Sequence, residues 1–287
     1  MERSASGWIN GFIGVMIFAG TLPATRMAVL QLDAGFVTAA RAIIAAVLAV
    51  ALLLTLRQPL PHRRDLPPLL AVSLGVVVGF PLLTALALRH ASSAHAIVFV
   101  GLLPLLTAVF GVLRGGDRPR PAFWVCSVLG SACVVGYATR HGIQASWRAD
   151  LLMLAAIAAC GMGYAEGARL SRHLGGWQVI SWALVIALPV MLPLMLVSWP
   201  PSVAHITAPA WWALGYVGVF SMMVGFVFWY RGLALGGIAA VSQLQLLQPF
   251  MGLALAALLL HEAVDASMLL VTLAAVLCVA GAKRFSR

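Results

Sequence analysis

The sequence predicts an all-α integral membrane protein of ten transmembrane helices, arranged as two related halves of five helices each. Of the 287 residues, 62% are hydrophobic and 9% are charged, and that charged fraction is about a third of the value for soluble domains. Apolar runs of about 20 residues, long enough to cross ~30 Å of hydrocarbon, recur from one end to the other. The second half also repeats features of the first. A water-soluble core has no use for so much apolar surface, so the bilayer is the expected solvent.

The apolar runs define ten expected crossings in chain order. They span residues 8–28, 36–56, 66–88, 93–113, 121–139, 149–170, 176–198, 209–231, 237–260 and 265–283. The first run leads directly into further crossings, so we expect it to remain as an anchor and not to be cleaved as a signal peptide.

Proline and glycine mark particular crossings. Prolines remove helix hydrogen bonds and loosen the backbone, and they fall in the first, third, fourth and ninth crossings at Pro23, Pro81, Pro104 and Pro249. Pairs of glycines four residues apart allow helices to approach closely. They fall in the third and sixth crossings at Gly75/Gly79 and Gly163/Gly167, and directly after the eighth at Gly232/Gly236.

The distribution of basic residues predicts the orientation. With the N-terminus in the cytoplasm, the cytoplasmic segments carry thirteen of the 18 Lys and Arg residues and the outer segments carry four, while Arg41 lies within the second crossing. Cytoplasmic loops are enriched in Lys and Arg. Both termini are therefore expected in the cytoplasm, with residues 60–65 and 170–175 on the same face.

An internal repeat relates the two halves. Pro104-Leu105-Leu106, Asp117 and Gly136 recur 145 positions later as Pro249-Phe250-Met251, Glu262 and Gly281. We expect one repeat over residues 1–142 and a second over 143–287. Because five crossings is an odd number, the second half must enter the membrane from the opposite side. Inverted repeats of this kind are typical of secondary transporters with one site near the midplane, opened alternately to either side.

The ends of the two halves carry a recognisable pattern. In the second half it reads Ala239-Ala240-Val241-Ser242, Gln248-Pro249-Phe250 and Leu259-Leu260-His261-Glu262, and in the first half Ser92-Ser93-Ala94, Leu103-Pro104-Leu105 and Gly116-Asp117. This pattern, with Gly20 through Arg26 and then Arg41, resembles the drug/metabolite transporter superfamily, whose repeat is called EamA. Gln248, Asp117 and His261 depart from the Glu, Glu and Gly that are usual there.

The resemblance covers nearly the whole chain and implies a ten-helix basket. Crossings one to four and six to nine would surround a central cavity, with crossings five and ten outside it. The superfamily carries amino acids, drugs, nucleotide sugars and sugar phosphates. Within it, this compact chain is similar to exporters of amino acids and related metabolites, including the YddG-like exporters of aromatic amino acids.

Polar side chains inside the apolar runs are the candidate binding groups, because each one is unfavourable in hydrocarbon. Ser242 and Gln245 share a face of the ninth crossing, and an amide suits a zwitterion because it both donates and accepts. The alternative is hydrogen bonding between helices. The full set expected around the cavity is Thr21, His95, Phe99, Tyr164, Ser242 and Gln245.

Two of these residues lie one turn apart in the fourth crossing. His95 can bind a substrate carboxylate or take up a proton, and Phe99 can form an apolar wall. Ordinary packing between helices explains both residues equally well.

Charges at the ends of the crossings suggest gates. Arg26 aligns with Arg169 at an offset of 143, and Asp117 aligns with Glu262 at 145. Each face then holds one arginine and one acid, and we expect the pair to form on the closed side and break on the open side. Alternatively, all four are solvated helix ends, where exposed pairs contribute about 0–1 kcal/mol.

Glu166 also carries two interpretations. It lies well inside the sixth crossing, where it can couple protons or capture a substrate amine. It can also form a local pair with Arg169, three residues later, and we favour this local pair.

Other classes of function are disfavoured. Cys126, Cys133, Cys160 and Cys278 lie in apolar runs without metal-ligand spacing, and His261-Glu262 lacks the second histidine of a zinc protease helix. We expect no enzyme, cofactor, metal or nucleic-acid partner. The expected protein is a bacterial inner-membrane transporter that exports small metabolites, amino acids above all. The alternatives are a passive uniporter or channel and an exporter of drugs or other metabolites.

Overall fold

A computed structural model describes residues 2–90, 96, 99–140, 147–203, 205–248, 250–252, 254–255 and 266–286. Helices in the first half are α1 (Glu2–Ala19), α2 (Thr21–Val29), α3 (Ala34–Thr55), η1 (Arg63–Asp65), α4 (Leu66–Val72), η2 (Ser73–Gly79), α5 (Phe80–His90), α7 (Leu103–Gly115) and α8 (Pro121–Arg140). Those in the second half are α9 (Trp147–Ser171), α10 (Gly176–Val197), α11 (Ala208–Tyr216), η3 (Val217–Val224), α12 (Gly225–Gly236), α13 (Ile238–Ser242), η4 (Gln243–Leu247) and α15 (Ala266–Phe285).

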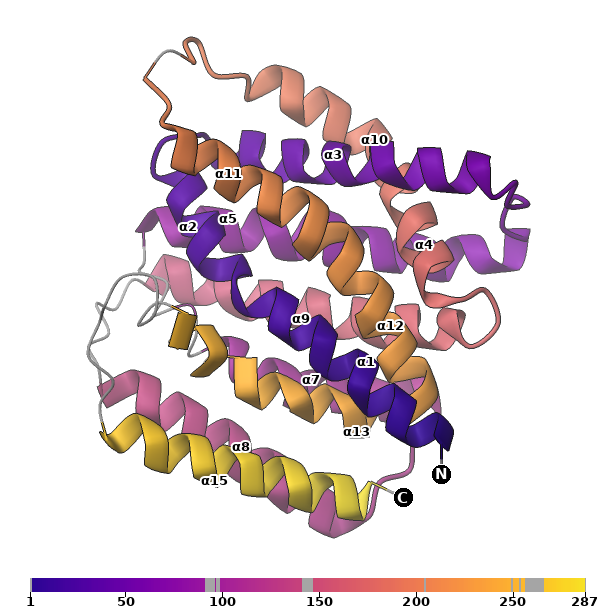
Figure 1. The fold of residues 1–287 in the computed structure, drawn as a ribbon, viewed down its shortest axis with the longest axis vertical. Helices are drawn as coiled ribbons and strands as arrows, with labels where there is room; N and C mark the ends of the chain where they lie inside the picture. Colours follow the sequence, from indigo (N-terminus) through magenta and orange to yellow (C-terminus); the bar gives the residue numbers. More distant parts are fainter. Residues whose placement is uncertain are drawn as a thin grey trace.

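The helices follow the expected crossings closely. Within the described residues, six continuous helices are long and apolar enough to cross a membrane: Ala5–Val29, Ala34–Thr55, Arg63–His90, Trp147–Ser171, Gly176–Val197 and Ala208–Gly236. The fourth, fifth, ninth and tenth crossings correspond to α7, α8, α13 with η4, and α15. Figure 1 shows these elements packed in one bundle, with α1, α11 and α12 running obliquely to α3 and α5.

Three pairs of equivalent helices pack against each other in antiparallel fashion. The start of α8 meets the end of α15, where the Arg120 amide donates to the Phe285 carbonyl at 3.1 Å. The start of α13 meets the end of α7, where the Ala239 amide donates to Asp117 Oδ2 at 2.7 Å. An added Cβ on Gly35, at the start of α3, would lie 2.5 Å from Ser198 Oγ at the end of α10.

An axis lying in the membrane plane reverses every helix that it relates. The two halves are therefore inverted, as the odd number of crossings predicts. Figure 1 places α8 and α15 side by side at one edge of the bundle, in agreement with the expected position of crossings five and ten outside the basket.

Glycines allow the other helices to approach closely. Gly232 on α12 faces the backbone of α1, where an added Cβ would lie 2.5 Å from Gly11 N and 2.8 Å from Gly11 Cα. Gly75 on η2 faces α9 in the same way, 2.5 Å from the Ala159 carbonyl oxygen. These contacts join crossing one to eight and crossing three to six, which are equivalent under the repeat. The glycine spacing in the sequence thus marks real helix contacts.

Two π-helical segments interrupt equivalent crossings. η2 lies in the third crossing and η3 in the eighth. π-Helical turns leave backbone groups less tightly paired and often occur at functional sites. The sequence gives no signal for them, and both border the central cavity described below.

Contacts between loops define two faces. On one face, His173 after α9 contacts Asp65 before α4 at 3.2 Å. On the other, Gln31 Nε2 donates to Thr207 Oγ1 at 2.9 Å, and Arg89 pairs with Asp33 at 3.1 Å. Residues 60–65 and 170–175 therefore lie together, as expected. Figure 1 shows both chain ends on one side of the bundle.

Candidate functional site: a central cavity

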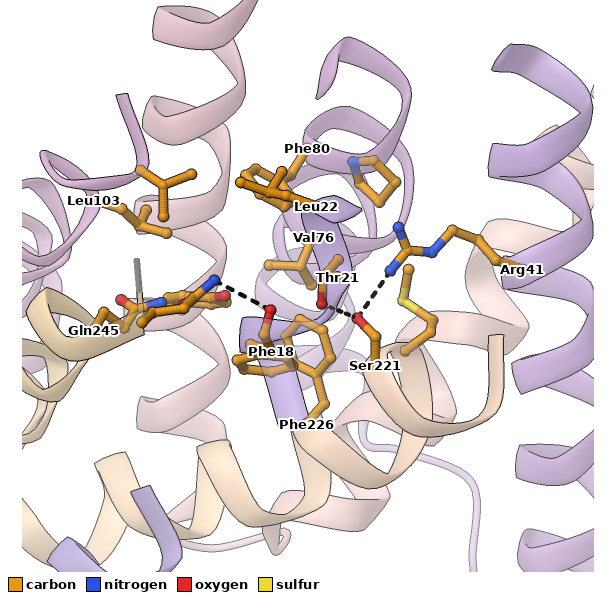
Figure 2. A pocket seen from close by; sticks show the side chains of 15 residues that line it. Phe18, Thr21, Leu22, Arg41, Val76, Phe80, Leu103, Ser221, Phe226 and Gln245 are labelled. Atoms are coloured by element: carbon orange, nitrogen blue, oxygen red, sulfur yellow. Dashed lines mark hydrogen bonds between the residues drawn. The ribbon is translucent and has the colours of Figure 1, made fainter. Parts of the chain in front are cut away.

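A cavity opens at the middle of the bundle between the two halves (Figure 2). It is lined by Phe18, Thr21, Leu22, Arg41, Val76, Phe80, Pro81, Val100, Leu103, Tyr164, Ser221, Met222, Phe226, Gln245 and Gln248. The cavity is small, about 20 Å³ as traced by the centre of a water molecule, which is room for one or two waters. In this conformation the cavity is too small to hold an amino acid.

The lining comes largely from equivalent positions of the two repeats. The matched pairs are Thr21/Tyr164, Val76/Met222, Phe80/Phe226, Val100/Gln245 and Leu103/Gln248, at offsets of 143 to 146 residues. The cavity therefore lies where the two inverted halves meet. Its lining is chemically uneven, because the second half supplies amides where the first half supplies Val100 and Leu103.

One end of the cavity is a polar cluster around Arg41 on α3. Arg41 is 3% exposed, and its Nη2 donates to Ser221 Oγ on η3 at 3.1 Å. The Ser221 and Thr21 hydroxyls share a hydrogen bond of 2.9 Å. Crossings one, two and eight are thus joined through three buried side chains.

Amides occupy the other end, across the cavity from Arg41 in Figure 2. Gln248 Nε2 donates to the Phe18 carbonyl at 3.3 Å. The side-chain oxygens of Gln245 and Gln248 are buried and have no hydrogen-bond partner among the residues that the structure describes. These two acceptors are available to a donor that enters the cavity.

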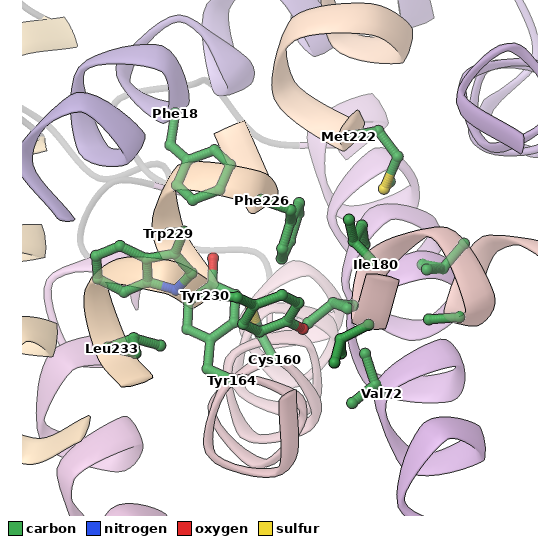
Figure 3. Packing of buried hydrophobic residues seen from close by; sticks show 14 of the residues in the cluster. Phe18, Val72, Cys160, Tyr164, Ile180, Met222, Phe226, Trp229, Tyr230 and Leu233 are labelled. Carbon is green, nitrogen blue, oxygen red and sulfur yellow. The ribbon is translucent and has the colours of Figure 1, made fainter. Parts of the chain in front are cut away.

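An aromatic cluster supports the cavity on the side of α9 and α12 (Figure 3). Tyr164 packs edge-on against Phe226 at 5.9 Å and Trp229 at 5.4 Å between ring centroids, and Phe18 contacts Phe226 at 5.1 Å. Trp229 is fully buried. These large rings fix the positions of Tyr164 and Phe226, which face the cavity.

The structure brings together some of the residues expected around the site. Thr21, Tyr164 and Gln245 line the cavity. Ser242 and Phe99 do not: the Ser242 hydroxyl donates to the Ala239 carbonyl at 2.9 Å, and Phe99 packs beside the apolar core. A second contact, from the Ser242 hydroxyl to the Pro104 carbonyl of α7 at 3.4 Å, is of the interhelical kind considered as its alternative. His95 lies outside the described residues.

The expected gate charges have different partners from those expected. Arg169 Nη2 pairs with Glu166 at 2.8 Å, whereas Asp117 caps α13 through Ala239 and lies 3.4 Å from Arg172. Arg26 donates to the Leu88 carbonyl. Glu262 lies outside the described residues.

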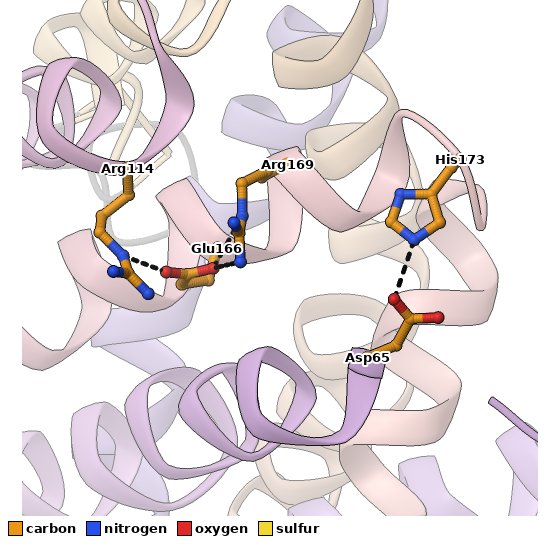
Figure 4. Close-up of polar contacts among 5 residues, drawn as sticks. All are labelled: Asp65, Arg114, Glu166, Arg169 and His173. Atoms are coloured by element: carbon orange, nitrogen blue, oxygen red, sulfur yellow. Dashed lines mark hydrogen bonds and ion pairs between the residues drawn. The ribbon is translucent and has the colours of Figure 1, made fainter. Parts of the chain in front are cut away.

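Glu166 is the centre of an ion cluster at the end of the bundle that carries Asp65 and His173 (Figure 4). Its carboxylate is 1% exposed and contacts both Arg114 and Arg169. The local pair with Arg169 is present as expected. The contact with Arg114, which reaches Glu166 from α7, was not predicted from the sequence. The carboxylate is fully engaged and is not part of the cavity lining.

Twelve of the fifteen residues that line the cavity were not in the set expected from the sequence, among them Phe18, Arg41, Ser221 and Gln248. Arg41 had a usable signal, because a charge within an apolar run is by default a candidate functional group. Ser221 had none, since its position depends on η3. Within the described part of the chain, no group of three or more His, Cys, Asp or Glu side chains is placed to hold a metal ion.

A multi-pass membrane protein built from two inverted halves around a shared cavity has the architecture of a transporter. The EamA-like transporter family model matches the chain twice, over residues 5–138 and 147–282. The chain therefore belongs to the EamA-like transporter family, whose members are transporters and not enzymes.

Two further similarities agree with this assignment. The chain is 61% identical over 287 residues to the uncharacterized transporter YdeK of Bacillus subtilis (strain 168), covering 100% of both chains. A crystal structure of a protein with 20% identity matches 97% of this chain and 96% of its own with a TM-score of 0.78. That likeness supports the fold alone.

Proposed function

We propose that this membrane transporter is a secondary transporter of the bacterial inner membrane that exports small metabolites, and amino acids in particular, by alternating access through the central cavity. The observation that carries the proposal is the position and chemistry of the cavity. It lies where the inverted halves meet, with a buried arginine at one end and unpartnered amide oxygens at the other. Such a site suits a zwitterion, whose carboxylate and ammonium both need partners.

The expected topology is part of the proposal. Both termini face the cytoplasm, with repeats over residues 1–142 and 143–287. The excess of Lys and Arg in the loops on that side supports this orientation, and so does the ion cluster of Arg114, Glu166, Arg169 and Asp117 with Arg172.

Alternating access is supported by the two repeats, which border one shared cavity. A cavity with room for one or two waters must widen before a solute can occupy it. The two π-helical segments, one from each half, border this space through Val76, Ser221 and Met222. We propose that these segments are where crossings three and eight rearrange to admit substrate.

The gate charges remain part of the proposal in modified form. On the cytoplasmic face, Arg169 with Glu166 and Arg172 with Asp117 would hold the closed state. On the outer face, Arg26 would pair with Glu262 when that side closes. The arginine on each face comes from equivalent positions, as alternating closure of inverted halves requires.

Exchange across a vesicle membrane tests the proposal. Purified protein is reconstituted into liposomes loaded with a labelled amino acid, and efflux is measured across a panel of amino acids, with and without a pH gradient. We expect unlabelled substrate outside to accelerate efflux several-fold for at least one amino acid, because an alternating carrier returns faster when loaded. Protein-free liposomes are the control.

Two results would contradict the proposal. If unlabelled substrate outside does not change the rate of efflux, the protein is a channel, or a uniporter whose return step does not limit the rate. Transport of drugs or other metabolites, with no amino acid carried, would reject the substrate class while leaving the transporter assignment in place.

A further inference from the structure

Arg41 is a buried charge without a counter-ion among the described residues. Its side chain is 3% exposed, and it forms no salt bridge within that part of the chain. Within the same residues its side chain donates one hydrogen bond, from Nη2 to the neutral Ser221 hydroxyl, and Nε has no partner there. An unpaired charge in a bilayer interior is strongly unfavourable, so a protein that retains it has a use for it.

The Arg41 side chain faces the cavity. Arg41, Ser221 and Thr21 are adjacent lining residues joined by hydrogen bonds of 3.1 and 2.9 Å. Figure 2 shows the guanidinium directed from α3 toward Ser221 at one end of the cavity. Arginine carries five N–H donors in a planar fork that matches a carboxylate, and here most of them are unused.

We propose that Arg41 binds the carboxylate of the transported molecule and is the residue that selects for anionic headgroups. This deepens the proposed function and rests on it. Once the cavity has widened to admit the molecule, its carboxylate lies against the Arg41 fork with the Ser221 and Thr21 hydroxyls beside it. The ammonium of the same molecule faces the side-chain oxygens of Gln245 and Gln248, and Phe18, Phe80 and Phe226 enclose its side chain.

This placement, with the carboxylate at Arg41 and the ammonium at the two amides, also accounts for the uneven lining of the cavity. Residue 186, which is 145 positions after Arg41, is an isoleucine, so the cationic end occurs once and not twice. The amides likewise occur only in the second half, where Val100 and Leu103 are the counterparts in the first. A zwitterion therefore has one preferred orientation in an otherwise pseudo-symmetric cavity.

Matched ligands test this assignment. Binding to purified protein is measured by thermal shift and efflux by liposome assay, for an amino acid, its primary amide and the corresponding amine without the carboxyl group. A charge-assisted hydrogen bond contributes enough to give the acid a preference of about 10- to 150-fold over the amide. Arg41→Gln is expected to remove that preference, so that acid and amide bind alike.

Two further variants keep the result interpretable. Arg41→Lys retains the charge without the fork and is expected to keep a reduced preference for the acid, even where Arg41→Gln fails to fold. Arg89→Gln removes an arginine paired with Asp33 outside the cavity, and it should leave the preference unchanged.

The possible outcomes separate the two proposals. Equal transport of acid and amide by the unaltered protein, or a preference that survives in Arg41→Gln, would overturn the role of Arg41. Arg41-dependent transport of carboxylates that lack an amino group would uphold that role and reject amino acids as the substrate. Transport confined to molecules without a negative group would overturn both.

Discussion

Replacing Gly232 by alanine is expected to destabilise the folded protein by about 1–3 kcal/mol, the usual effect of inserting a methyl group into a tightly packed contact. The new Cβ would lie 2.5 Å from Gly11 N and 3.0 Å from the Gly7 carbonyl oxygen, both backbone atoms of α1. Backbone cannot turn aside as a side chain can, so α1 and α12 must separate. The change is measured by thermal unfolding of purified protein, with loss of the monodisperse species as the readout.

Gly215→Ala is the matched control for this substitution. Gly215 lies in α11 of the same crossing, and a Cβ there would meet nothing within 4 Å. Alanine is more favourable than glycine in a helix interior by about 1 kcal/mol, so this variant should be as stable as the unaltered protein or more so. The two glycine variants should thus shift the unfolding temperature in opposite directions. A Gly232→Ala protein as stable as Gly215→Ala would show that α1 and α12 do not meet at this point.

Replacing both arginines that contact Glu166 should lower the stability of the folded protein far more than replacing the glutamate itself. Glu166 is 1% exposed, whereas the Arg114 and Arg169 side chains are 56% and 43% exposed. In Arg114→Gln/Arg169→Gln the carboxylate is left buried without a cation, which costs about 3–5 kcal/mol when a buried charge loses its partners. In Glu166→Gln the two guanidinium groups can turn to water, and the loss should be less than half as large.

Thermal unfolding of the two proteins at neutral pH tests this order. Arg148→Gln, a substitution at the end of α9 far from Glu166, is the control for loss of a positive charge on the same helix. If Glu166→Gln proves the less stable protein, the carboxylate has a role other than accepting from these two arginines, such as the proton coupling considered as its alternative.

Much of the fold follows from the sequence because the bilayer imposes simple rules. Apolar length places the crossings, and an odd number of them per repeat requires inversion. The antiparallel contacts of α8 with α15 and of α7 with α13 confirm that arrangement. Glycine spacing also predicts which helices approach closely, because the absence of a side chain has a direct geometric consequence.

The site is less predictable because it depends on which face of each helix turns inward. Gln245 and Ser242 share a face by periodicity, yet Gln245 lines the cavity while Ser242 bonds to the backbone of its own helix. Side chains three residues apart eclipse in the 3₁₀ geometry of η4, so both start from the same side of the helix. The short Ser242 hydroxyl stays on a backbone carbonyl, while the longer Gln245 amide reaches the cavity. Similarly, Ser221 reaches the cavity from a π-helical segment whose presence no residue pattern signals.

For the charged residues, too, the alignment of the two repeats does not determine which side chains are in contact. Equivalent positions in the repeat do identify the charged residues at the helix ends. Alignment does not show which acid each arginine meets: Arg169 pairs with Glu166 one turn earlier on its own helix, α9, and Asp117 pairs with Arg172. Arg41 is the most informative of the residues that were not expected at the site, because the equivalent position in the other half is an isoleucine.

Inversion of the two halves is tested most directly by labelling single cysteines at equivalent loops with a membrane-impermeant thiol reagent in oriented cells. The native cysteines are first replaced by serine, and the four exposed positions are Gln31, Arg63, His173 and Thr207. The inverted fold predicts that Gln31→Cys and Thr207→Cys react from outside, while Arg63→Cys and His173→Cys react only after the cytoplasmic face is opened. Reaction of Gln31→Cys and His173→Cys from the same face, or of Arg63→Cys and Thr207→Cys from the same face, would contradict the inverted arrangement and the shared cavity that depends on it.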